Sequence, residues 1–99
     1  MIRHIVMWNF KEGFTSEQNI ANAGKVKEGL EGLAGVIPGI IKMEVVIEAL
    51  KTSNRDIVLN SLFVSRAALA AYQIHPDHVR VSEYVGTVMM NRTCIDYLE

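Results

Sequence analysis

The stretch DIVLNSLFVSRAALAAYQIHPDHVRV, from Asp56 to Val81, holds a strand, a helix start and a helix break in immediate succession. Its first part is rich in branched and large apolar residues bounded by polar ones, which predicts a strand over Asp56–Phe63. Ser65 follows and suits the N-cap of a short, alanine-rich helix over Arg66–Ile74. This stretch therefore predicts a strand–helix unit with a sharp boundary.

The HPDH segment then divides the helical region. Pro76 disfavours helical geometry at His75, the residue before it, and is itself well suited to the first turn of a new helix. We therefore expect a second short helix over Pro76–Val85, closed by Gly86. His75 would lie outside both helices as a junction residue, hydrogen-bonded to nearby backbone.

The sequence before this stretch predicts strand, helix and strand. IRHIVMWNF, Ile2–Phe10, is rich in β-branched and aromatic residues, as strands are. Thr15 and Gln18 have capping-box spacing, and apolar residues then recur at helical intervals until Pro38. IIKMEVVIE, Ile40–Glu48, predicts the next strand.

The closing segment TVMMNRTCIDYLE, Thr87–Glu99, predicts a last strand. The order is then βαββαβ, with the second helix broken at Pro76. This is the ferredoxin-like pattern, an α+β fold in which helices cover one face of an antiparallel four-stranded sheet. No repeat or interdomain linker interrupts the pattern, so we expect one domain over residues 1–99.

Both faces of the predicted sheet are apolar. On the first strand one face would carry His4, Val6, Trp8 and Phe10, and the other Arg3, Ile5, Met7 and Asn9. The third strand likewise has large apolar residues on both sides. Each such side chain left in water forgoes about 1.5–3 kcal/mol of burial. A second copy pressed sheet to sheet would bury the outer face, so we expect an obligate homodimer with two-fold symmetry.

The composition excludes several classes of partner. Of the 99 residues 49% are hydrophobic and 21% are charged, as in globular domains. The formal net charge is −1 without a basic cluster, which argues against binding nucleic acid or an anionic membrane. No apolar run approaches the ~20 residues that span a bilayer, and the N-terminus is not typical of a signal peptide. The single Cys94 fits a reducing compartment, so we expect a cytoplasmic protein.

Four segments together resemble the stress-responsive A/B barrel family, also called Dabb domains. They are RHIVMWNFKEG near the start, IPGI after the first helix, RDIVLNSLFVSRAALAAYQIHPDHVRV, and DYLE at the end. The resemblance covers essentially the whole chain. It implies a βαββαβ protomer and a dimeric α+β barrel in which the two sheets face each other.

The resemblance also implies candidate catalytic residues. In a polyketide cyclase of the family, a tyrosine and the second histidine of the HPxH element perform an intramolecular aldol reaction; here they correspond to Tyr72 and His78. The first-strand histidine bordering that pocket corresponds to His4, whereas a further pocket histidine is replaced by Ile57, so the polar lining is poorer here. The implied roles are general base for His78 and carbonyl hydrogen-bond donor for Tyr72, with no metal or cofactor.

Two classes of function stay open. The first is a stress-responsive, non-catalytic dimer with a small hydrophobic ligand pocket, for which we expect lining by His4, Val6, Trp8 and Leu59. The second is a cofactor-free enzyme acting on a carbonyl compound such as a polyketide. Tyr72 and His78 would also fit a purely structural role at the helix junction, and Trp8 leaves open the chemistry of the cofactor-free monooxygenases of the wider barrel group. An open cavity that holds the Tyr72 hydroxyl and the His78 ring favours the enzyme; a closed gap favours the first class.

A metal site in the HPDH segment is not expected. It would need His75, Asp77 and His78 to converge, and side chains at such closely spaced positions rarely do so. No second cluster of cysteine or histidine completes a ligand set.

Two residues of the last strand need an explanation. Cys94 lies mid-strand without a neighbouring base, so we interpret it as a small buried hydrophobic residue rather than a nucleophile. Arg92 alternates with Met90 and Cys94, an unusual place for a guanidinium. We expect it to pair with Asp96 or Glu44, or else to meet an anionic ligand.

Overall fold

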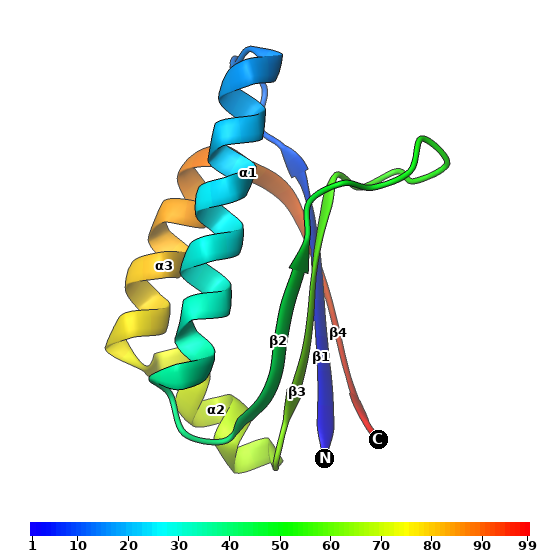
Figure 1. Ribbon diagram of the computed structural model, residues 1–99. Helices are drawn as coiled ribbons and strands as arrows, with labels where there is room; N and C mark the ends of the chain where they lie inside the picture. Colours follow the sequence, from blue (N-terminus) through cyan, green and yellow to red (C-terminus); the bar gives the residue numbers. More distant parts are fainter.

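The computed structural model describes residues 1–99 and has a four-stranded antiparallel sheet in the spatial order β2-β3-β1-β4. The strands are β1 (Ile2–Phe10), β2 (Ile40–Val46), β3 (Ile57–Phe63) and β4 (Met89–Leu98). The helices are α1 (Ser16–Glu31), α2 (Arg66–Ile74) and α3 (Pro76–Val88), with a 3-10 turn, η1 (Gly32–Gly35), after α1. All helices lie on one face of the sheet and the other face is bare (Figure 1). The predicted ferredoxin-like α+β fold is confirmed.

The two predicted helix caps are present. The Thr15 hydroxyl accepts a hydrogen bond from the Gln18 N–H at 3.1 Å, and the Gln18 side chain accepts one from the Thr15 N–H at 2.9 Å. The Ser65 hydroxyl accepts from the Ala68 N–H at 3.1 Å. Each side chain satisfies a backbone donor that the first turn leaves free, so α1 and α2 begin where the sequence predicts.

His75 forms the junction between α2 and α3, as predicted. Its backbone is extended, with φ −63° and ψ 134°, and its N–H donates to the Tyr72 carbonyl at 3.2 Å. Its Nδ1 accepts from the Asp77 N–H at 3.1 Å and so caps α3, while Pro76 occupies the first turn. The break is a single residue long, and Tyr72 and His78 lie on either side of it.

Some predicted boundaries are wrong. Helix α3 does not close at Gly86 but continues to Val88, and β4 therefore begins at Met89 rather than Thr87. Val85 and Val88 are both buried, and their packing outweighs the roughly 1 kcal/mol that one glycine costs inside a helix. Strand β2 ends two residues earlier than predicted, at Val46.

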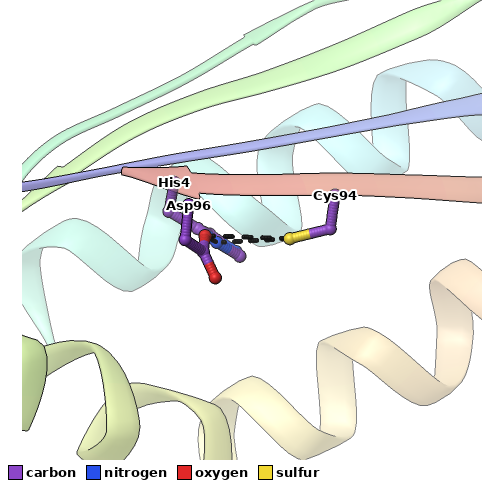
Figure 2. A group of neighbouring side chains, drawn as sticks. All are labelled: His4, Cys94 and Asp96. Carbon is purple, nitrogen blue, oxygen red and sulfur yellow. Dashed lines mark hydrogen bonds and ion pairs between the residues drawn. The ribbon is translucent and has the colours of Figure 1, made fainter. Parts of the chain in front are cut away.

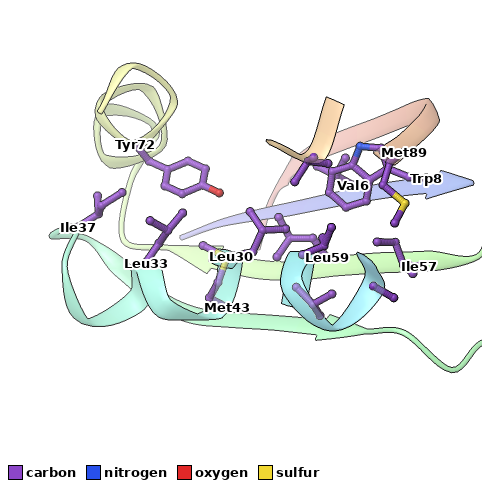
Figure 3. Packing of buried hydrophobic residues seen from close by; sticks show 14 of the residues in the cluster. Val6, Trp8, Leu30, Leu33, Ile37, Met43, Ile57, Leu59, Tyr72 and Met89 are labelled. Carbon is purple, nitrogen blue, oxygen red and sulfur yellow. The ribbon is translucent and has the colours of Figure 1, made fainter. Parts of the chain in front are cut away.

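The core lies between the sheet and the helices. On β1 and β3 the residues that face the helices are buried and their neighbours are only partly buried, so the predicted alternation is confirmed. Figure 3 shows Val6, Leu59, Leu30 and Met43 packed in this layer. None of the helices is both long and apolar enough to span a membrane.

The uncovered face of the sheet carries exposed apolar side chains. Ile5 and Met7 of β1 are half-buried, whereas Ile95 and Tyr97 of β4 are exposed. The loop between β2 and β3 projects past the sheet on this uncovered side (Figure 1). The sheet face that the sequence leaves without a partner is therefore open in the protomer.

Candidate functional site

A cavity of about 270 Å³ opens between the sheet and the helices. Eight of its 14 lining residues are hydrophobic, and none is an aspartate or a glutamate. The lining includes all six residues singled out in the sequence: His4, Val6, Trp8, Leu59, Tyr72 and His78. Residues from β1, β3, α2 and α3 thus meet at one place.

Tyr72 contributes a buried hydroxyl to this cavity. Only 1% of its surface is exposed, and its hydroxyl has no hydrogen-bond partner. The side chain points from α2 into the layer between helices and sheet (Figure 3). Burial raises the pKa of Tyr72 well above its usual value, because the charged phenolate would be poorly solvated. Tyr72 is therefore a permanent hydrogen-bond donor with its donor unused.

His78 lies beside it on α3, half-buried. Its Nδ1 donates to the Gln73 carbonyl at 3.2 Å, which leaves the lone pair on Nε2. Burial lowers the pKa of His78, and the hydrogen bond to Gln73 opposes this only in part. His78 is therefore neutral at physiological pH, with one ring nitrogen free to accept a proton.

His4 stands on β1 at the wall of the cavity and contacts Asp96 of β4. Its Nδ1 forms a hydrogen bond with the Asp96 carboxylate, and the Cys94 sulfur lies 3.8 Å from the same nitrogen (Figure 2). The His4 ring also meets the Tyr72 ring edge-on, with centroids 6.2 Å apart. Asp96 thereby holds the orientation of a buried ring that borders Tyr72.

The interpretation of Cys94 as a buried hydrophobic residue is wrong. Its side chain is exposed, and it lies 3.7 Å from the Asp96 carboxylate as well as beside His4. The antiparallel register pairs His4 with Asp96 and Val6 with Cys94, which brings the three polar side chains to one face of the sheet. Sequence reasoning missed this cluster because it depends on the register between the first and last strands.

His4, Cys94 and Asp96 are the residues of the chain that could hold a metal ion. Their ligand atoms lie within 4.8 Å of one another, and nitrogen, sulfur and carboxylate oxygen are donors that Zn²⁺ takes. However, partial burial and the Asp96 charge raise the pKa of the Cys94 thiol, which opposes the thiolate that a metal needs. The cluster is also not a catalytic triad. In a triad the nucleophile and the carboxylate contact different ring nitrogens of the histidine, whereas Cys94 and Asp96 both contact Nδ1 of His4.

Arg92 also lines the cavity, and its expected ion pair is absent. Arg92 pairs with no carboxylate, because Asp96 binds His4 and Glu44 contacts Lys42 on the opposite edge strand. Its guanidinium is the only formally charged group in the lining. A single cation without an ion pair thus borders a cavity that has no acidic residue.

Comparison with known proteins supports the fold. A dimeric protein of unknown function with a ferredoxin-like fold from Bacteroides fragilis superposes with a TM-score of 0.91 at 26% identity, over 99% of this chain and 95% of that one. A Dabb family protein from Mesorhizobium loti has a TM-score of 0.75 at 24% identity, over 99% and 95% of the two chains. A putative antibiotic biosynthesis monooxygenase from Nitrosomonas europaea shares the fold at 19% identity, with a TM-score of 0.77 over 100% and 98%.

Among proteins with curated descriptions, none matches this sequence. The family model of the stress responsive A/B barrel domain, in contrast, matches residues 2–99. The resemblance drawn from the sequence motifs is confirmed by this match. Since the model spans all but the first residue, the chain belongs to the stress responsive A/B barrel (Dabb) domain family.

Proposed function

We propose that the protein is a homodimer whose helix–sheet cavity binds a small carbonyl compound and moves a proton on the carbon next to the carbonyl, without a cofactor. The observation that carries this proposal is the unpartnered, buried Tyr72 hydroxyl beside the free nitrogen of His78 in an open cavity. A buried hydroxyl without a hydrogen-bond partner is energetically unfavourable, and such groups often have a functional role. A ligand oxygen would satisfy it.

The chemistry follows from the protonation states. Nε2 of His78 removes a proton from the carbon beside the carbonyl, and the C–H electron pair moves toward the carbonyl oxygen, which becomes an enolate. The Tyr72 hydroxyl donates a hydrogen bond to that oxygen as its negative charge develops. In an aldol closure the enolate carbon then attacks a second carbonyl of the same molecule, and the oxygen of that carbonyl, now an alkoxide, takes the proton from His78. Without a second carbonyl, the enolate carbon takes the proton back from His78.

The size and lining of the cavity limit the ligand. Its 270 Å³ lies near the small end of the roughly 300–1,000 Å³ typical of ligand pockets. The hydrophobic part of its wall includes Val6, Trp8 and Leu59. The ligand is therefore a small molecule with an apolar body.

The dimer is supported by the sheet and by the relatives. The uncovered face exposes Ile95 and Tyr97, whose burial a second copy would provide. The Bacteroides fragilis protein, 26% identical, is described as dimeric. Two sheets that pack face to face place the cavity, on the helix side, outside the dimer interface, so each protomer has its own site.

A second candidate is ligand binding without chemistry. It is favoured by the apolar wall and by Ile57, which is fully buried at the position where the family's polyketide cyclase has a further histidine. Under this alternative Tyr72 donates to a bound carbonyl and His78 is only a wall of the cavity.

Exchange of carbon-bound hydrogen with solvent deuterium separates the two candidates. The probes are medium-chain ketones and N-acetylcysteamine thioesters of short polyketides, followed by NMR. We expect His78→Asn to lower the exchange rate at least about 100-fold and Tyr72→Phe to lower it comparably. Binding is followed by the fluorescence of Trp8, the single tryptophan of the chain, which lines the cavity.

Two matched controls come from the same segment. Tyr84→Phe removes another buried hydroxyl without a partner, and Tyr84 does not line the cavity. His75→Asn changes the other histidine of the HPDH element and keeps a good N-cap. Both control variants should catalyse hydrogen exchange in the probes at the wild-type rate. Bound probes that exchange no faster than in buffer would contradict catalysis and leave the binding function.

A further inference from the structure

Strand β4 contains a bulge opposite Trp8. Asn9 pairs with Met90 and Met7 pairs with Thr93, so Trp8 faces two residues, Asn91 and Arg92. Asn91 has a φ of 56°, the only positive φ at a residue other than glycine in this protein. Asparagine tolerates this conformation better than most residues, and one extra residue in a strand is the definition of a bulge.

The bulge decides which side chains of β4 face the cavity. Met89 is buried on the helix side, so an unbroken strand would turn Asn91 and Thr93 to that side as well. The extra residue reverses the alternation beyond the bulge. Arg92 then joins Met89, Met90 and Asn91 in the cavity wall, while Ile95 goes to the uncovered sheet face. The backbone irregularity therefore serves to bring a guanidinium to the site.

Arg92 lacks an acidic partner within the protein. It forms no ion pair with Asp96, which lies on the same face of β4 and binds His4 instead. With no carboxylate in the lining, the cavity carries a formal charge of one positive unit in a chain whose net charge is −1. This wall favours binding of an oxyanion, because the guanidinium of Arg92 can donate two parallel N–H hydrogen bonds to two oxygens of the anion.

The charge of Arg92 also reaches the pair that would react. It opposes protonation of His78, which contributes to the lowered pKa of that residue, and it acts on the pKa of Tyr72 in the direction of the phenolate. A cation near Tyr72 and His78 favours the negative charge of an enolate as well as that of a ligand. Arg92, Tyr72 and His78 line the same cavity, so one small molecule bound there can contact all three residues.

We propose that the ligand of this cavity is an oxo acid, whose carboxylate binds Arg92 at the solvent edge while its carbonyl meets Tyr72 and His78 inside. A carboxylate is favoured over a phosphate because one guanidinium, without a lysine or a glycine-rich loop in the lining, matches one negative charge. This inference rests on the proposed function in one respect, the binding of a carbonyl by Tyr72 and His78. It does not require that the protein catalyses a reaction there.

The test compares 5-oxodecanoate with its methyl ester, two probes of similar shape that differ in charge. Binding is measured by Trp8 fluorescence and by calorimetry. We expect the wild-type protein to bind the acid at least tenfold more tightly than the ester. Arg92→Gln should lower the affinity for the acid to that for the ester and leave the affinity for the ester unchanged. Arg92→Lys should retain part of the preference for the acid.

Arg66→Gln is the matched control, since Arg66 is an exposed arginine outside this cavity, and it should keep the preference for the acid. Equal affinity for acid and ester, binding of neither probe, or tighter binding of decyl phosphate would each overturn the inference. A preference for the acid that depends on Arg92, in a protein that exchanges no hydrogen, would uphold the oxo acid and refute only the catalytic proposal.

Discussion

The ring of Tyr72 lies 4.1 Å from the ring of His78, centroid to centroid, with a tilt of 40° between the two planes. The side chains come from two helices and meet because only His75 separates α2 from α3. Burial raises the pKa of Tyr72 and lowers that of His78, so it keeps both groups neutral. A neutral base next to a neutral donor is the state from which enolate formation starts.

The first prediction concerns the pH dependence of the exchange reaction. Since the base must be unprotonated, kcat/KM should fall as the pH drops through the pKa of His78, which lies below the usual value of 6.5. The rate should be flat around neutral pH. Tyr72, whose pKa lies far above that range, should add no basic limb below pH 10. An acidic limb centred above 6.5 in the pH–rate profile would exclude His78 as the base.

The second prediction concerns stability. The folded protein has the lower pKa for His78, so protonation favours the unfolded chain. The contribution of His78 is therefore present above about pH 6.5 and is lost as the pH falls toward the folded-state pKa. His78→Asn should lose less of its melting temperature than the wild type between pH 7.5 and pH 5. An equal fall in melting temperature for the wild type and His78→Asn would contradict this assignment. His75→Asn is the reference variant and should behave as the wild type does.

Removal of the Tyr72 hydroxyl should not destabilise the protein. Losing a hydrogen-bonded hydroxyl usually costs about 1 kcal/mol, but Tyr72 has no partner to lose. We expect the free energy of unfolding of Tyr72→Phe, from urea denaturation, to equal that of the wild type or to exceed it by up to about 1 kcal/mol. Tyr84→Phe should behave alike. A loss of stability above about 1 kcal/mol would show a structural hydrogen bond instead.

Much of this site follows from local sequence signals. Ser65, Pro76 and the capping box at Thr15 set helix ends through backbone hydrogen bonds over a few residues, and such signals can be read without a structure. The alternation on β1 and β3 then places His4 and Leu59 toward the helices. The family motif adds Tyr72 and His78, and the fold brings these residues to one cavity.

The remainder depends on contacts between distant parts of the chain. The bulge at Asn91 has no strong local signal, yet it decides that Arg92, Cys94 and Asp96 face the helices. The prediction of a paired Arg92 is wrong because Asp96 binds His4 and Glu44 contacts Lys42. The prediction of a buried Cys94 is wrong because the thiol is exposed beside His4 and Asp96. Likewise, α3 passes through Gly86 because its packing against the sheet, not its local propensity, sets its end.

Two glycines offer a contrasting pair of mutations. Gly39 precedes β2 with a φ of 90°, and a Cβ placed there would lie 2.6 Å from the Ala68 Cβ. Gly39→Ala should therefore destabilise the protein by at least about 1–2 kcal/mol. Gly24 lies inside α1, where an added Cβ would meet nothing within 4 Å, so Gly24→Ala should stabilise by about 0.5–1 kcal/mol. Urea denaturation measures both, and two shifts of the same sign would contradict the backbone conformation at one of the two glycines.

The last prediction tests the dimer through the uncovered sheet face. Ile95 faces Ile5 across the β1–β4 pair, and 56% of its surface is exposed in the protomer. Ile95→Asp would place a charge in the middle of a sheet-to-sheet interface, where it could not be hydrated, so we expect sedimentation at micromolar concentration to give monomers. Ile74→Asp is the control, because Ile74 is 79% exposed at the end of α2, which lies on the other side of the sheet (Figure 1); it should leave the dimer intact. A wild-type protein that sediments as a monomer, or an Ile95→Asp variant that stays dimeric, would place the interface elsewhere.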